Sequence, residues 1–83
     1  MSDTIIKLAS KLADDTLTAM DKLGEERLFV EVGSVLAAAS QSLEEAYLTE
    51  VRVRLAERAA RRFLTERLKK GLAAAAAQEK PGP

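Results

Sequence analysis

The sequence predicts an all-α fold: a helical hairpin or three-helix chain that assembles into an oligomeric, most simply dimeric, helical bundle. Apolar residues recur every three or four positions, and no proline occurs before Pro81. A chain of 83 residues buries only about 60% of the surface that its unfolded form exposes. It contains neither cysteine nor histidine, so disulfides and the common zinc sites cannot reinforce a small core. Association with another chain remains as the stabilising device.

The first helix is expected over residues 3–23. Its apolar positions begin at Ile5 and continue along one face through Leu8, Leu12, Ala19 and Leu23. Ser2 or Thr4 can cap the helix start, and Asp3 suits the positive end of the helix dipole. Gly24 stands where a left-handed residue ends many helices.

The second helix is expected over residues 26–40, but its first half is ambiguous. Residues 28–32 are partly β-branched and lie between Gly24 and Gly33, which also suits a short strand. A lone strand would need a partner from another chain, whereas the helical stripe from Leu28 to Ala39 does not. Gly33 and Ala37 stand four residues apart and suit a close helix crossing.

The third helix is expected over residues 43–70, with Gly71 as its natural end. Ser42 and Glu45 have the spacing of a capping box, so the chain either breaks near residues 40–42 or continues as one helix. Residues 1–72 then form a single helical domain. Residues 73–83 form an alanine-rich and Pro/Gly tail that we expect to be disordered at its end.

The third helix has apolar side chains on two sides. One stripe is expected to face inward, and it comprises Ala46, Val53, Ala56, Ala60, Phe63, Leu64 and Leu68. Leu48, Val51 and Leu55 form a second stripe on nearly the opposite side, with Tyr47 beside it. A helix that is apolar on both sides must be covered on both, and the first helix is too short to cover all of it. The sequence therefore predicts an interface with another copy, or with a partner, formed by Tyr47, Leu48, Val51 and Leu55.

The charged residues are segregated along the chain although the formal net charge is zero. Residues 1–50 hold ten acidic and four basic side chains, and residues 51–70 hold eight basic and two acidic ones. Part of the basic segment forms one continuous face of the third helix: Arg54, Arg58, Arg61, Arg62 and Lys69.

Three interpretations of this basic face stay open: a solvated face or ion pairs with acids of the same assembly, a site for nucleic acid, and a site for an acidic protein or a membrane surface. The first is favoured. The sequence has no recognisable DNA-binding motif, and no aromatic residues alternate with the arginines for stacking on bases. No tryptophan is available to anchor a membrane-surface helix.

Catalysis, a cofactor and a metal site are not expected. Histidine and cysteine, the commonest general base and the readiest nucleophile, are missing. Adjacent acidic pairs such as Asp14-Asp15 point about 100° apart on a helix and do not converge on a ligand. The four glycines are too scattered for a phosphate-binding loop.

The sequence thus predicts a small cytoplasmic, non-enzymatic protein that associates with itself and with helical partners. Its start lacks the pattern of a secretory signal, and its apolar runs are too short to span a membrane. An oligomerising adaptor, a chaperone-like co-chaperone or a regulatory subunit fits this description. The alternative is a small nucleic-acid-binding regulator that uses the basic face.

Overall fold

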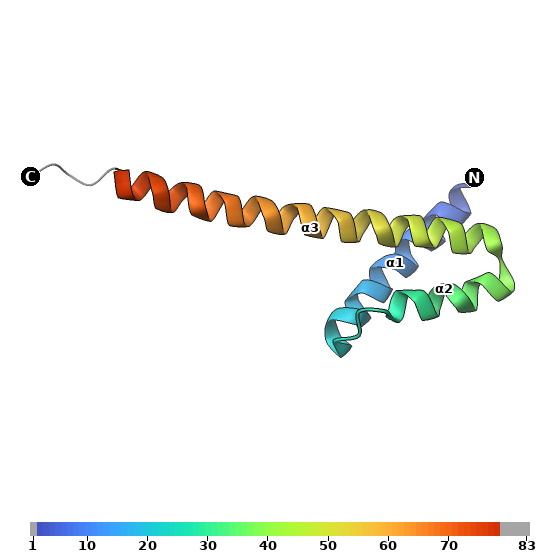
Figure 1. Cartoon of the computed structure of the whole chain (residues 1–83). Coiled ribbons are helices and arrows are strands. Elements are labelled where there is room, and N and C mark those ends of the chain that lie inside the picture. The colour runs from blue at the N-terminus through green and yellow to red at the C-terminus, as the bar shows by residue number, and fades with distance from the viewer. Residues whose placement is uncertain (1, 79–83) are drawn as a thin grey trace, which may run out of the picture.

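The computed structural model describes residues 2–78, and these residues form three helices and no strand. The helices are α1 (Asp3–Leu23), α2 (Leu28–Ala39) and α3 (Gln41–Gln78). Helices α1 and α2 pack on the first half of α3, and the second half of α3 extends away alone (Figure 1). The molecule is therefore long and thin, with extents of 71 × 28 × 13 Å.

Helix α1 begins and ends at residues with local capping signals. The Ser2 hydroxyl accepts a hydrogen bond from the Ile5 backbone N–H at 3.2 Å, and Gly24 adopts the left-handed conformation with φ of 69°. The Gly24 N–H donates to the Met20 carbonyl oxygen at 2.8 Å. The predicted bounds of this helix and the role of Gly24 are confirmed.

Helix α2 confirms the helical interpretation of residues 28–32 over the strand alternative. It begins at Leu28 and ends at Ala39, one to two residues inside the predicted range. The Cβ that an alanine would carry at Gly33 would lie 3.4 Å from the Leu48 side chain. Gly33 therefore lies where α2 packs on α3, at a distance that would admit a methyl group.

The chain breaks between α2 and α3 at Ser40, which has an extended backbone with φ of −160° and ψ of 109°. The Ser40 hydroxyl accepts a hydrogen bond from the Leu43 N–H at 3.2 Å and caps α3. Ser42, the capping residue that the sequence suggested, lies inside the helix instead. The cap belongs two residues earlier because Ser40 is the residue with the non-helical backbone that an N-cap requires.

Helix α3 is longer than predicted, because it passes through Gly71 and the alanine run to Gln78. Alanine has the highest helix propensity of any residue type. The five consecutive alanines therefore offset the single glycine, which lowers helix stability by about 1 kcal/mol. The expected disorder at the end of the tail concerns residues 79–83, which lie outside the described part of the chain.

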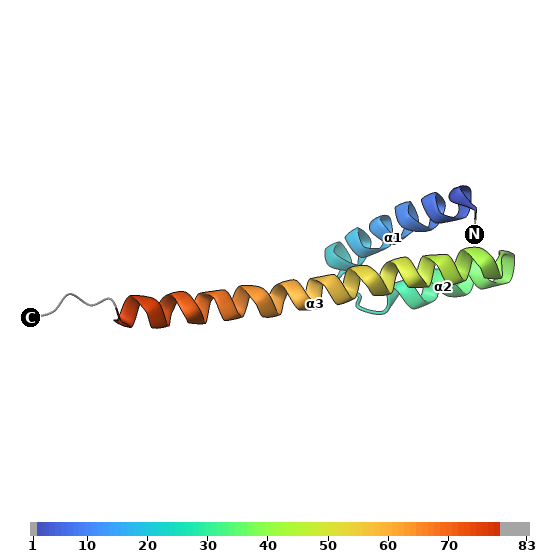
Figure 2. The ribbon, with the colours of Figure 1, turned by 90° about the horizontal axis from the view of Figure 1, so that it is seen from above.

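The core lies where α1 crosses α3, with α2 completing it on the other side (Figure 2). Ala9 and Ala13 of α1 are fully buried, and their small side chains allow close contact with α3. The other buried apolar residues are Leu17, Met20, Ala46, Tyr47 and Val51. This core contains only two large, fully buried side chains, Tyr47 and Val51.

Candidate interaction surface

The four residues predicted to contact another chain lie instead in the chain's own core. Tyr47 and Val51 are 0% exposed, and Leu48 and Leu55 are half-buried against the same core. They share the side of α3 that α1 and α2 cover, so they do not offer a surface to a second copy. The prediction is corrected in this respect. This side of the helix is buried, as predicted, but α1 and α2 of the same chain bury it and not a second chain.

The second half of α3 is the part of the fold that nothing covers. Every residue from Ala56 to Gln78 is exposed, and this segment, here called the rod, extends beyond the other two helices in both views (Figures 1 and 2). At a rise of 1.5 Å per residue, the rod is about 34 Å long. The prediction that one chain cannot cover its longest helix is confirmed for the described residues.

Of the stripe that the sequence predicted to face inward, the structure buries Ala46, which is 5% exposed, and leaves the other members in solvent, all but Val53 on the rod. We define the apolar stripe as Val53, Ala56, Ala60, Phe63, Leu64 and Leu68. Its large members are 60% (Val53), 68% (Phe63), 63% (Leu64) and 59% (Leu68) exposed. On a helical wheel the stripe lies on the side of α3 roughly opposite the buried Tyr47 and Val51, and α1 approaches it at Val53, which shares a groove with Leu17. An exposed apolar patch on a protein surface often marks an interaction site.

Arg54 joins the rod to the body of the molecule, and its guanidinium group has three partners. Its Nε lies 2.6 Å from Asp14 Oδ1 of α1, and its Nη1 lies 2.8 Å from Glu50 Oε1. Its Nη2 donates to the Ser10 hydroxyl at 2.8 Å. Glu50 and Asp14 both raise the pKa of Arg54 by hydrogen bonding. This residue is a structural clamp between α1 and α3.

The remaining basic-face residues divide into paired and unpaired groups. Arg58 forms a two-pronged contact with Asp21 of α1, with nitrogen to oxygen distances of 3.1 and 3.0 Å. Arg61 pairs with Glu57 one turn earlier. Arg62 and Lys69 form no ion pair within residues 2–78. Arg54 and Arg58 thus confirm the interpretation that the basic face meets acids of the same assembly, and two exposed cations remain.

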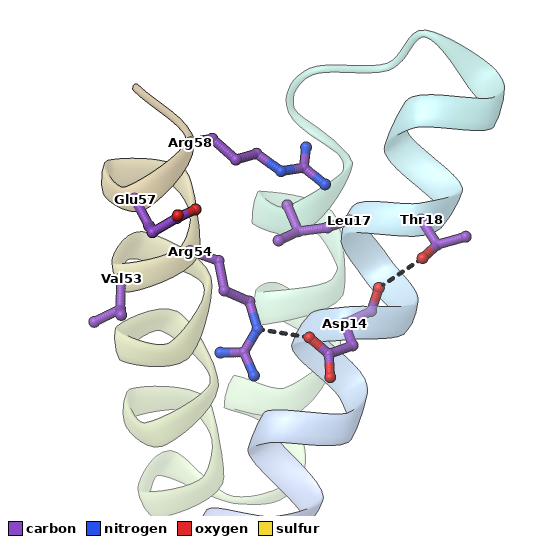
Figure 3. Close-up of a pocket in the computed structure, with 7 residues that line it drawn as sticks. All are labelled: Asp14, Leu17, Thr18, Val53, Arg54, Glu57 and Arg58. Atoms are coloured by element: carbon purple, nitrogen blue, oxygen red, sulfur yellow. Dashed lines mark hydrogen bonds and ion pairs between the residues drawn. The ribbon is translucent and has the colours of Figure 1, made fainter. Parts of the chain in front are cut away.

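A groove of about 690 Å³ lies between α1 and α3, at the base of the rod (Figure 3). Asp14, Leu17 and Thr18 line it from α1, and Val53, Arg54, Glu57 and Arg58 line it from α3. The Arg54 to Asp14 ion pair spans the groove. Because Val53 also begins the apolar stripe, the groove and the stripe form one continuous surface.

A second hollow of about 550 Å³ shares Arg58 with the first as a lining residue. Met20, Gly24 and Glu26 contribute from the end of α1 and the following turn, and Leu55, Ala59 and Arg62 contribute from α3. Both hollows are open and lie where α3 leaves the body. The point where the rod leaves the body is therefore flanked by two hollows.

The described residues contain no cluster of acidic side chains able to hold a metal ion. Every buried side-chain nitrogen and oxygen in them has a hydrogen-bond partner. None of the three helices combines the length and apolar character needed to cross a bilayer.

In comparisons with known proteins, no family model, curated protein or solved structure matched this chain significantly.

Proposed function

We propose that the protein is a non-catalytic helical interaction module that buries the apolar stripe on a helix of another chain. An oligomerising adaptor, a co-chaperone or a regulatory subunit would act in this way. The observation that carries the proposal is a stripe of large apolar side chains on a rod that the chain itself leaves uncovered. A cytoplasmic location, expected from the sequence, remains part of this proposal.

The energetic argument rests on the large members of the stripe. Full burial of a Val, Leu or Phe side chain contributes about 1.5 to 3 kcal/mol, and four such side chains lie exposed along one face. A helix without tertiary contacts is also only marginally stable in water. Covering the stripe would stabilise both the side chains and the helix that carries them.

The competing proposal is a nucleic-acid-binding regulator that uses the basic face. The exposed positions of Arg62 and Lys69 support it, because unpaired cations on a protruding helix can reach phosphates. Two observations weigh against it: Arg54 and Arg58 are already paired within the chain, and the stripe beside them is apolar. We therefore favour the interaction module.

The test is sedimentation equilibrium of the full chain across the micromolar range. We expect a concentration-dependent dimer or larger species, and we expect the double variant Leu64→Lys/Leu68→Lys to shift it to the monomer. Val35→Lys is the matched control because Val35, on α2, is 73% exposed and lies outside the stripe. A chain that stays a folded monomer throughout the range, with the rod helical, would contradict the proposal for self-association.

A further inference from the structure

We infer that the occupant of the apolar stripe is the rod of a second copy, antiparallel to the first about a two-fold axis near Ala60. This inference rests on the proposed function and names its partner. In this arrangement each rod lies along the first residues of the partner's rod and along the partner's body. Leu68 of one copy enters the groove that Leu17 and Val53 of the other copy line.

The distribution of charge favours the antiparallel orientation over the parallel one. Residues 2–55 hold ten acidic side chains against six basic ones, whereas residues 56–78 hold six basic side chains against two acidic ones. A parallel pair would place the two basic rods side by side, and like charges in contact are unfavourable. An antiparallel pair places each basic rod against the acidic body of its partner, including the acidic side of α1.

The stripe is also self-complementary about Ala60. In an antiparallel pair centred there, Ala56 of one helix faces Leu64 of the other, because each lies four residues from Ala60. Val53, seven residues before the centre, faces the region of Leu68, eight residues after it. The small Ala56 thus meets the larger Leu64, and the alanine at the centre allows the two helices to approach closely.

The contact with the second rod ends at the groove between α1 and α3. Val53 is both a member of the stripe and a wall of the groove, and Leu17 lines the same groove from α1. A Leu68 side chain that arrives opposite Val53 therefore meets apolar surface from two helices. By two-fold symmetry the same contact forms twice, so the site on each copy is completed by the other.

The experiment uses single cysteines, which the sequence allows because the chain contains none. Under mild oxidation we expect Ala60→Cys to form a disulfide-linked dimer, and we expect Val53→Cys mixed with Leu68→Cys to form a mixed dimer. We expect Ala75→Cys, also on the rod, to remain unlinked. In the antiparallel pair the two copies of position 75 stand about 45 Å apart at 1.5 Å per residue, far beyond the reach of a disulfide.

The controls and outcomes separate this inference from the proposed function. Each variant is first shown to keep the wild-type helix content by circular dichroism, and all are oxidised again in urea, where cross-linking must become equal. Efficient linking through Ala75→Cys, without the mixed Val53→Cys and Leu68→Cys product, would indicate a parallel pair and overturn the inference while association stands. A monomer in sedimentation would overturn this inference together with the self-association in the proposed function.

Discussion

The hydroxyl of Tyr47 donates a hydrogen bond to the carbonyl oxygen of Phe29 at 3.1 Å. The same hydroxyl lies 3.3 Å from the Thr16 hydroxyl, so one side chain of α3 contacts α1 and α2 together. Tyr47 is fully buried, and Thr16 is the one buried polar residue of the described core. This contact fixes how the three helices meet, and hence the direction in which the rod leaves them.

Replacing Tyr47 with phenylalanine tests this contact. Tyr47→Phe keeps the ring and removes the hydroxyl, so we expect a loss of about 1 kcal/mol in the free energy of unfolding. Tyr47→Ala also removes the ring, and we expect a loss of about 3 to 5 kcal/mol, enough to unfold a core this small. Urea denaturation followed by circular dichroism measures both. An unchanged free energy of unfolding in Tyr47→Phe would contradict the role assigned to the hydroxyl.

Alkaline pH gives an independent test of the same residue. Burial raises the pKa of the Tyr47 phenol above its ordinary value of 10.0, with the Thr16 hydrogen bond acting in the opposite direction. The unfolded chain therefore loses this proton before the folded chain does. The resulting stability is fully present below about pH 10 and is lost as the pH rises further through the folded pKa.

We expect the wild-type free energy of unfolding to fall more steeply above pH 10 than that of Tyr47→Phe. The difference between the pH dependences of the two proteins reports the contribution of Tyr47 alone. Lys11 and Arg54, whose pKa values are also raised, are present in both proteins. The chain has one tyrosine and no tryptophan, so tyrosinate absorbance reports this phenol alone. A normal titration midpoint in the folded protein would contradict the prediction.

Arg54→Ala tests the clamp between α1 and α3. The variant removes hydrogen bonds to Asp14, Glu50 and Ser10. Because the Arg54 side chain is 24% exposed, solvent screens part of this energy, and we expect a loss of roughly 1 to 2 kcal/mol. Arg52→Ala is the control, since Arg52 is exposed and unpaired within residues 2–78, and it should cost less than about 0.5 kcal/mol. Similar losses in both variants, measured in urea, would argue against the clamp.

The sequence was most informative where the deciding interactions are local. Ser2 caps the start of α1 and Gly24 ends it, both through contacts within a few residues. Both signals can be recognised without knowledge of the rest of the fold. The end of α3 was missed because Gly71 is a common helix stop, whereas the alanines that follow it favour continuation to Gln78.

The orientation of α3 could not be read from periodicity. The pattern showed that both sides of the helix are apolar, but not which side α1 and α2 would cover. The stripe with more members was assigned to the interior, yet the body covers the stripe that holds Val51, because Tyr47 beside it reaches hydrogen-bond partners on both other helices. The need for an external partner was predicted from the two apolar stripes together with the length of the helix, and the uncovered rod agrees with that prediction.

Replacing the glycines tests how independent the rod is from the body. Gly71→Ala adds a methyl group where nothing lies within 4 Å, and it should favour the helix by about 0.5 to 1 kcal/mol. At concentrations where the chain is monomeric, we expect increased hydrogen-exchange protection in the rod and an unchanged urea midpoint for the body. Gly33→Ala is the matched variant in α2: its Cβ would lie 3.4 Å from Leu48, an ordinary contact, so it should raise that midpoint. If Gly71→Ala and Gly33→Ala raised the urea midpoint equally, the rod and the body would unfold together.

The basic face gives a test between the two proposals. Arg54 and Arg58 are held by Asp14 and Asp21, and Phe63 lies in the apolar stripe and not among the arginines, so stacking on bases has no platform there. The acidic side chains of residues 2–55 also repel phosphate. We therefore expect no retardation of DNA or RNA by micromolar protein at low salt. Retardation that weakens with salt and disappears in Arg62→Glu/Lys69→Glu would favour the nucleic-acid-binding alternative, because both residues are exposed cations whose reversal leaves the core and the stripe intact.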